Sequence, residues 1–352
     1  TGAVVGGAFG YMSGTLSNVD SFGAVTVTGS NYNVGGLIGD AGSSNITNAF
    51  ATGAVTAGSS YQVGGLLGYH GGGSLTNVAS SGGNISGTSS VGGLVGWYGS
   101  GTITTASTTG NVSGSTNVGG LVGYSSSTAN IIGASTTGTV TGTANYVGGL
   151  VGQLYTGNST ISNSFATGNV QGTYGVGGLV GFMDLNYTRT IDQNSYAQGT
   201  VVGTGTGNGY VGGLVGGAYY SNISNGYVNS PGISATGGYV GGLVGIANVS
   251  SNVTNTYVNS NITTTGTSYV GGLVGKLAGT IQASDSAVGS IPANGTKYSY
   301  AAGAVTGRYD VGGLVGRADT SAFIYNAYST GAVTADVNYG GLVGFVTPGA
   351  TL

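Results

Sequence analysis

The chain has 352 residues, of which only 4% are charged, and its eight Asp against five Lys and Arg give a net charge of −3. A soluble globular protein usually carries about 25% charged residues, and a nucleic-acid groove needs clustered Lys and Arg. We therefore expect no nucleic acid as a partner. The absence of cysteine excludes disulfides and thiolate metal sites. No apolar run approaches the roughly 20 residues of a membrane span, so we expect no membrane insertion of this segment.

One six-residue pattern, Val-Gly-Gly-Leu-Val-Gly with small variations, recurs along the whole chain. It begins at residues 34, 63, 91, 118, 147, 176, 211, 240, 270 and 311, with a degenerate copy at Val5–Gly10 and a last copy at Tyr339–Gly344. Successive copies are 27 to 30 residues apart, except for two intervals of 35 and 41. A period of about 29 residues indicates a repeat protein. We predict a single array over residues 1–352, with loop insertions near residues 183–209 and 291–301.

Each repeat contains three short apolar segments separated by Gly, Ser, Asn and Thr. In one repeat they are Val147–Gly152, Thr160–Phe165 and Gly168–Gly172. Alternation and enrichment in Val, Ile, Thr and Tyr favour strands, and the signals of helices are missing. We therefore predict an all-β protein, a β-solenoid in the form of a right-handed parallel β-helix, with about 29 residues and three short strands per coil and about 11–12 coils.

Stacked coils align equivalent residues into ladders about 4.8 Å apart. A leucine ladder is expected in the core, at Leu37, Leu66, Leu94, Leu121, Leu150, Leu179, Leu214, Leu243, Leu273, Leu314 and Leu342. Asparagine amides are expected to hydrogen-bond from coil to coil at Asn48, Asn163, Asn194, Asn225 and Asn255. Two aromatic columns accompany these ladders, one directly before the motif and one at the end of the second strand of each repeat.

The repeat resembles the GLUG repeat. The resemblance lies in Gly-Gly-Leu-Val-Gly, preceded by Tyr-Val and followed by Asn-Ser-Phe-Ala-Thr-Gly-Asn-Val at Asn163–Val170, and it covers essentially the whole chain. That repeat occurs in large bacterial surface proteins, notably filamentous-haemagglutinin-like adhesins, and beside the protease part of IgA-cleaving peptidases. The resemblance implies a secreted, elongated stalk or adhesive region, extracellular or at the cell surface. It implies no chemistry, because the zinc-binding His-Glu-x-x-His of those peptidases lies outside the repeats.

Few residues offer catalytic chemistry. His70, the only histidine, precedes three glycines and is expected to lie exposed in a turn rather than in a catalytic triad. Asp184 and Asp192 flank Arg189, and Asp310 lies near Arg308. A carboxylate pair is what glycoside hydrolysis requires, but local ion pairs are the interpretation we favour. We expect no catalytic residue, no cofactor and no metal, and hence no enzyme.

The function we expect is an extracellular structural or adhesive solenoid that forms a stalk, an adhesin segment or a head-to-tail filament. Neither end offers a capping helix, so the expected partners are copies of this chain end to end or flanking parts of a longer chain. Host or matrix glycans are further candidate partners. The alternative is a carbohydrate-binding or carbohydrate-active β-helix that uses exposed aromatics such as Tyr219 and Tyr220 together with Asp184 and Asp192. Candidate glycosylation acceptors are Asn45, Asn222 and Asn252.

Overall fold

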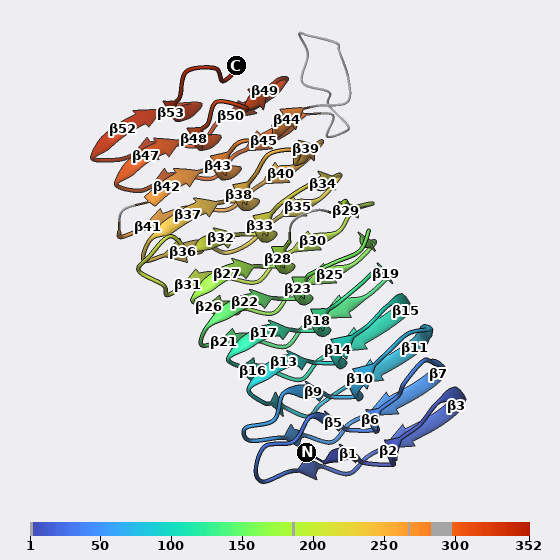
Figure 1. Ribbon diagram of the computed structural model, residues 1–352. Helices are drawn as coiled ribbons and strands as arrows, with labels where there is room; N and C mark the ends of the chain where they lie inside the picture. Colours follow the sequence, from blue (N-terminus) through green and yellow to red (C-terminus); the bar gives the residue numbers. More distant parts are fainter. Residues whose placement is uncertain (1–2, 185–186, 267, 283–297) are drawn as a thin grey trace.

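The computed structural model describes residues 3–184, 187–266, 268–282 and 298–352. In these residues the chain winds into a β-solenoid of about eleven turns with roughly 29 residues per turn, and it contains no helix. Equivalent strands of successive coils lie side by side, and the two ends of the chain lie at opposite ends of the stack (Figure 1). The predicted all-β solenoid is confirmed. The described residues include no helix that could cross a membrane.

Four parallel sheets run along the solenoid, and the repeated motif supplies two of them. The first sheet contains β1 (Val4–Gly6), β5 (Asn33–Gly35), β9 (Gln62–Gly64), β13 (Ser89–Gly92), β17 (Thr116–Gly119), β22 (Asn145–Gly148), β27 (Tyr174–Gly177), β32 (Tyr210–Gly212), β37 (Gly238–Gly241), β42 (Ser268–Gly271), β47 (Tyr309–Gly312) and β52 (Val337–Gly340). The second sheet contains β2 (Phe9–Tyr11), β6 (Ile38–Asp40), β10 (Leu67–His70), β14 (Val95–Tyr98), β18 (Val122–Ser125), β23 (Val151–Leu154), β28 (Val180–Met183), β33 (Val215–Ala218), β38 (Val244–Ala247), β43 (Val274–Leu277), β48 (Val315–Ala318) and β53 (Val343–Val346).

The other two sheets complete each coil. The third sheet begins with one long strand per coil, in β3 (Gly14–Ser21), β7 (Ser44–Ala51), β11 (Ser74–Ser80) and β15 (Gly101–Thr108). It continues with two shorter strands per coil, in β19 (Ala129–Ile132), β20 (Ser135–Thr136), β24 (Thr160–Ser162), β25 (Phe165–Ala166), β29 (Arg189–Asp192), β30 (Tyr196–Ala197), β34 (Ser221–Ser224), β35 (Tyr227–Val228), β39 (Asn252–Thr254), β40 (Tyr257–Val258), β44 (Thr280–Gln282), β45 (Ser299–Ala301), β49 (Phe323–Ile324) and β50 (Ala327–Ser329). The fourth sheet contains β4 (Val25–Thr26), β8 (Val55–Thr56), β12 (Ile85–Ser86), β16 (Val112–Gly114), β21 (Val140–Gly142), β26 (Val170–Gly172), β31 (Val201–Gly203), β36 (Ile233–Ala235), β41 (Ile262–Thr264), β46 (Val305–Thr306) and β51 (Val333–Thr334).

The prediction of three strands per coil is wrong, because the motif forms two strands joined by a tight bend. In the second coil β5 ends at Gly35 and β6 begins at Ile38. A Cβ atom on Gly35 would lie 2.0 Å from the carbonyl oxygen of Ile38, and one on Gly36 would lie 2.1 Å from the carbonyl oxygen of Gly65 in the next coil. The first glycine therefore permits the bend, and the second permits close stacking of the coils.

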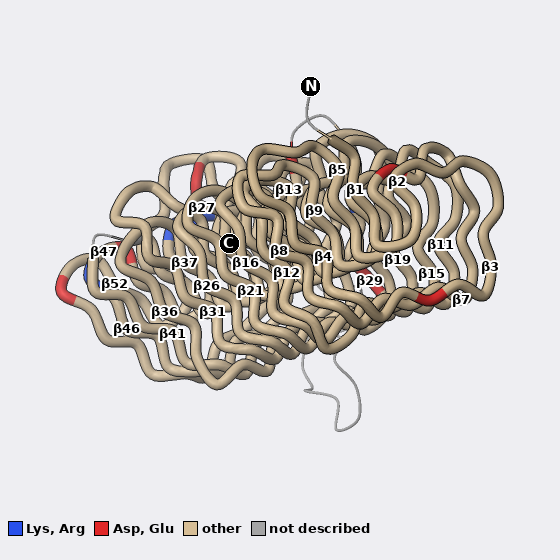
Figure 2. The backbone as a smooth tube through the Cα atoms, turned by 90° about the horizontal axis from the view of Figure 1, so that it is seen from below, with Lys and Arg blue, Asp and Glu red and all other residues tan. Residues whose placement is uncertain are grey.

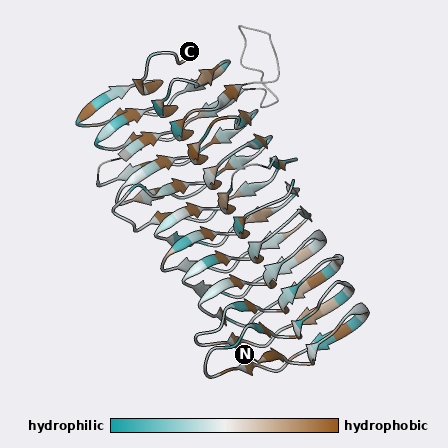
Figure 3. Ribbon diagram, in the orientation of Figure 1, coloured by the Kyte–Doolittle hydropathy of each residue, from teal (hydrophilic) through white to brown (hydrophobic). Residues whose placement is uncertain are grey.

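Coil-to-coil register places the core inside the four sheets. Val34 pairs with Val5 on one side and with Val63 on the other. The expected leucine ladder is fully buried from Leu37 to Leu314, whereas Leu342 in the last coil is 37% exposed. Figure 3 shows hydrophobic residues recurring along the sheets, coil after coil. Because each coil contributes equivalent apolar side chains, burial is continuous along the solenoid.

The extra length of the two long repeats can be located from the register. Val170 and Val176 are six positions apart, whereas their partners Val201 and Val211 are ten apart. Most of the first insertion therefore lies between β31 and β32. In the second long repeat the extra residues fall between Ile281 and Tyr300, the partners of Val253 and Tyr257. Of the insertion predicted at 291–301, residues 291–297 lie outside the described residues, and Ser299–Ala301 forms β45.

Candidate ligand-binding cleft

Outward-facing aromatic residues of the third sheet form a continuous stack. Neighbouring rings have centroids 4.8–5.4 Å apart and planes within 13° of parallel. We call this stack the third-sheet ladder; it consists of Phe165, Tyr196, Tyr227, Tyr257, Tyr300 and Tyr328. Burial within the stack raises the pKa of Tyr227 and Tyr257 above the ordinary tyrosine value. Mutual stacking holds the rings, so their flat faces are covered.

A second aromatic row follows the junction between the first and second sheets. Its first-sheet rings are Tyr146, Tyr174, Tyr210, Tyr239 and Tyr269. The second sheet contributes Phe182, whose ring lies 4.7 Å from Tyr146 and 6.1 Å from Tyr210. We call this arrangement the junction row. It forms because the residues flanking each motif copy point outward, while the Val and Leu of the motif point into the core.

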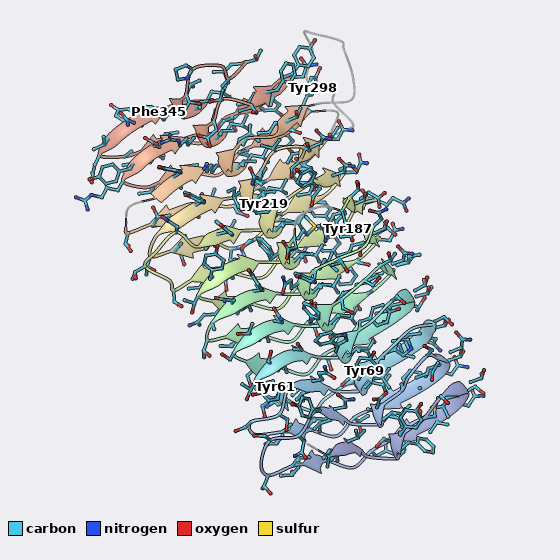
Figure 4. All side chains as sticks on the ribbon, viewed as in Figure 1. Tyr61, Tyr69, Tyr187, Tyr219, Tyr298 and Phe345 are labelled. Atoms are coloured by element: carbon cyan, nitrogen blue, oxygen red, sulfur yellow. The ribbon has the colours of Figure 1, made fainter. Side chains whose placement is uncertain are left out.

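Toward the C-terminal coils the junction row opens into a cleft of about 410 Å³. Binding sites for small molecules typically measure about 300–1,000 Å³ and combine aromatic walls with a few polar groups. Phe345, labelled in Figure 4, is one of the residues that line this cleft. The lining residues are Asn208, Gly238, Tyr239, Tyr269, Tyr309, Asp310, Arg317, Asn338 and Phe345. The first-sheet strands β37, β42, β47 and β52 and the second-sheet strands β48 and β53 thus supply most of its walls.

Arg317 lies at the centre of the charged groups around the cleft. Its Nε lies 3.1 Å from Asp319 Oδ1, its Nη1 lies 3.6 Å from Asp310 Oδ2, and Nη1 also donates to the Tyr269 hydroxyl at 3.2 Å. The guanidinium carbon lies 5.1 Å from the centroid of the Tyr269 ring and 5.0 Å from that of Phe345. Burial disfavours its charge, but the hydrogen bond to Asp319 and the surrounding charges raise the pKa of Arg317. The guanidinium is therefore charged and held in place.

Two further polar groups are fixed beside Arg317. Asp310 is only 5% exposed, and its Oδ1 accepts a hydrogen bond of 2.9 Å from Asn338 Nδ2. Both residues have positive φ, 44° for Asp310 and 47° for Asn338, a conformation that Asp and Asn adopt more readily than other non-glycine residues. Lys276 Nζ lies 3.1 Å from Asp319 Oδ2, in the same carboxylate that contacts Arg317. The cleft thus presents donors and acceptors in a fixed arrangement.

Sequence reasoning found only part of this cluster. Asp310 was expected to pair with Arg308, but Arg308 lies beside Asp336, with 3.5 Å between Nε and Oδ2, while Asp310 faces Arg317. Figure 2 shows how sparse charged positions are along the solenoid. Comparing the residues that flank each motif copy could have revealed the cluster, because Asp310 directly precedes one copy and Arg317 directly follows it.

The structure corrects the prediction for His70. This side chain is fully buried at the end of β10 rather than exposed in a turn. Its ring stacks on Tyr98 with centroids 5.2 Å apart, and Nε2 lies 3.0 Å from the main-chain oxygen of Ser44. Burial lowers the pKa of His70 below the ordinary histidine value. Strand β10 continues past the motif, so alternation turns Tyr69 outward and His70 inward.

The structure places Asp184 beside Arg189, and Asp192 at the other end of the strand that Arg189 begins. The side chain of Arg189 is fully buried and donates to the main-chain oxygens of Asp184, Tyr187 and Tyr155. Asp184 follows β28 of the second sheet and accepts from Gln153 Nε2 at 3.4 Å. Asp192 ends β29 of the third sheet, and burial raises the pKa of its carboxyl group.

The tyrosines of the alternative carbohydrate site differ in exposure. Tyr219 packs on Phe182 with ring centroids 5.4 Å apart, and its hydroxyl donates to that of Tyr210 at 3.5 Å. Figure 4 labels it near the middle of the stack. Tyr220 is 41% exposed. The Tyr219 ring therefore packs against the junction row.

The asparagine ladder lies at corners of the third sheet. Asn48 Nδ2 donates to Asn18 Oδ1 at 3.0 Å, and Asn163 Nδ2 donates to the Gln193 side chain, also at 3.0 Å. The expected members of the ladder all have positive φ, between 48° and 62°, at Asn48, Asn163, Asn194, Asn225 and Asn255. These residues therefore also turn the backbone.

The candidate glycosylation acceptors are also engaged between coils. The Oδ1 of Asn45 accepts a hydrogen bond of 2.9 Å from the main-chain nitrogen of Ser74. Asn252 Nδ2 donates to Asn222 Oδ1, again at 2.9 Å. All three side-chain amides thus hydrogen-bond to a neighbouring coil. In the described residues no group of three or more His, Asp or Glu side chains is placed to hold a metal ion.

Comparison with protein families identifies the GLUG motif at residues 30–56, 59–86 and 143–171. The predicted GLUG-repeat region is thereby confirmed. Neither the curated proteins nor the solved structures include a match.

Proposed function

Because this chain is a solenoid with GLUG repeats, we propose that it is an extracellular structural segment, a stalk or adhesin segment that maintains a rod at the cell surface. The observation that carries the proposal is the pairing of equivalent residues from coil to coil. In the first sheet, for example, Val34 pairs with Val63, and Val63 pairs with Val91. In such an array length grows with the number of repeats, while each coil contacts only its neighbours.

The chemistry of the chain suits an exposed rod. Parallel pairing satisfies backbone donors and acceptors along the four sheets, and the core ladders bury apolar side chains in coil after coil. With only 4% charged residues, few stabilising contacts depend on salt concentration. In this proposal the chain is not an enzyme, and its role is to maintain the length and shape of the rod.

The strands at the two ends of the stack support end-to-end association. Val4 and Phe9 in the first coil are 40% and 38% exposed, and Val346 in the last coil is 40% exposed. An open strand edge with apolar side chains can pair with another strand. The partner we propose is a further coil of the same kind, from flanking repeats of a longer chain or from a second copy. A head-to-tail contact between copies propagates into a filament.

Negative-stain electron microscopy at several protein concentrations tests this association. We expect rods that lengthen with concentration beyond the roughly 55 Å of twelve coils spaced about 4.8 Å apart. Val346→Lys, which places a charge on the end strand, is expected to give only single rods. Val249→Lys is the matched control, because Val249 is 48% exposed but lies between β38 and β39, away from both ends. Rods that never lengthen, or two variants that behave alike, would contradict association through these ends.

A further inference from the structure

Beyond this structural role, we propose that the cleft formed by Tyr239, Tyr269, Asp310, Arg317 and Asn338 binds a neutral saccharide. The inference does not depend on end-to-end association. It rests on the shape of the cleft, on the polar groups that converge there, and on the departure of these coils from the pattern of the rest of the array.

The walls of the cleft offer the edges and the hydroxyl groups of aromatic rings to a sugar. The rings of Tyr239 and Tyr269 lie 5.2 Å apart and 18° from parallel along the first sheet. Phe345, on the second sheet, also lines the cleft, and the Arg317 guanidinium lies about 5 Å from the ring centroids of both Tyr269 and Phe345. Aromatic side chains with a polar handle make apolar contact with C–H groups while their hydroxyl groups hydrogen-bond. A volume of about 410 Å³ is that of a small-molecule site.

The polar groups supply both donors and acceptors, which a sugar hydroxyl requires. Asn338 and Arg317 both contact the Asp310 carboxylate, and Arg317 also donates to the Tyr269 hydroxyl. Asp319 completes the set by contacting Arg317 and Lys276. The two cations, Lys276 and Arg317, balance the two anions, Asp310 and Asp319. This balance favours a neutral ligand over an anionic or cationic one.

The cluster is a local departure from the repeat. In the second-sheet column after the motif, Trp97 pairs with Tyr124 and Gln153 pairs with Phe182, whereas Lys276 pairs with Arg317. The solenoid therefore does not require charges in this column. In a chain with five Lys and Arg in total, placing two of them beside a cleft is specific to these coils.

The polar groups are also held in place before any ligand binds. Asp310 is nearly buried and is fixed by Asn338, and the guanidinium of Arg317 is held by Asp319 and by the ring of Tyr269. Groups that are already ordered lose little conformational entropy on binding. The cleft can therefore bind a flexible oligosaccharide through a rigid set of contacts.

The test is binding of the full chain to an array of neutral oligosaccharides built from pentoses, hexoses and N-acetylhexosamines, with uronic-acid oligosaccharides beside them. Isothermal titration calorimetry then gives the affinity for the neutral oligosaccharide that binds best. Asp310→Asn keeps the size and the positive φ of the residue but removes its charge, and we expect roughly tenfold weaker binding. Tyr269→Phe removes one hydroxyl, and we expect a several-fold loss.

The matched control is Tyr257→Phe in the third-sheet ladder. It also removes one tyrosine hydroxyl, but outside the cleft, and should leave the affinity for the oligosaccharide unchanged. Thermal melts of all variants confirm that they are folded. The inference is overturned by any of three results. These are the absence of binding to every neutral oligosaccharide at millimolar concentration, a preference for uronic-acid oligosaccharides, and equal affinity in folded Asp310→Asn and the unmodified chain.

Discussion

In the motif at residues 147–152 the two glycines contact different neighbours. A Cβ atom on Gly148 would lie 2.0 Å from the carbonyl oxygen of Val151 in the same bend, and one on Gly149 would lie 2.1 Å from the carbonyl oxygen of Gly178 in the next coil. Both distances are shorter than a real Cβ atom tolerates, and the obstructing atoms belong to the backbone. A methyl group on Gly148 therefore opens the bend, and a methyl group on Gly149 forces the coils apart.

Gly149→Ala tests this contact. We expect it to lower the free energy of unfolding by about 3 kcal/mol, because the backbone of two stacked coils must shift. Urea unfolding followed by circular dichroism measures the effect. Gly207→Ala is the control, since a Cβ atom there meets nothing within 4 Å. Equal stability of the two variants would show that the coils do not stack at this spacing.

His70 gives a residue-scale prediction for pH. Burial lowers its pKa in the fold, so the folded chain holds it neutral while the unfolded chain takes up a proton near the ordinary histidine pKa of about 6.5. Its contribution is complete above that pKa and is lost as the pH falls below it. We expect the free energy of unfolding to decline between about pH 7 and pH 5.

His70→Gln removes the only histidine of the chain, and its stability is expected to change less over the same range. Urea unfolding at a series of pH values compares the two proteins, and the slope against pH is the quantity that matters. Parallel slopes in both proteins would assign the pH dependence to other groups.

At the scale of the strands, the corners of the third sheet depend on residues that accept positive φ. Asn225 has a φ of 53° between β34 and β35, and its main-chain nitrogen donates to the main-chain oxygen of Thr254 in the next coil at 3.1 Å. Most residues adopt this conformation at a cost of roughly 1–2 kcal/mol. The recurrence of Asn at this corner thus serves the backbone as well as the side-chain ladder.

Asn225→Ala is expected to lower the free energy of unfolding by about 1–2 kcal/mol, measured by chemical denaturation. Asn225→Gly keeps access to positive φ and should stay within about 1 kcal/mol of the unmodified chain. If alanine is tolerated as well as glycine, the conformation of this corner is not what selects asparagine.

The period, the ladders and the parallel solenoid could be predicted because equivalent positions in each coil have equivalent surroundings. The division of the motif into two strands could not be predicted. Val34–Gly39 is one apolar run in the sequence, and its bend depends on a close contact between Gly35 and Ile38. The burial of His70 was missed because its strand extends beyond the motif. Asp310 and Arg317 meet across the same bend in another copy of the motif, Val311–Gly316. Their contact could therefore be recognised only once the motif was known to fold into two strands.

For the whole molecule, the sheets continue through every described coil, and adjacent coils differ mainly in their outward side chains. The interior ladders set the cross-section, and the number of repeats sets the length. Local differences such as the cleft are carried on the surface without interrupting the core. A rod built in this way should lose or gain complete coils without losing its fold.

Small-angle X-ray scattering of a chain lacking residues 64–147 tests this account most directly. The deletion joins Val63 to Gly148, which occupy adjacent positions in the register, and removes three coils. We predict a cooperatively folded protein with an unchanged cross-section and a maximum dimension shorter by about 14 Å, at about 4.8 Å per coil. Deleting residues 64–133 instead does not remove whole coils and should disrupt folding. A thinner rod, an unchanged length or loss of folding in the whole-coil deletion would contradict a solenoid of stacked, interchangeable coils.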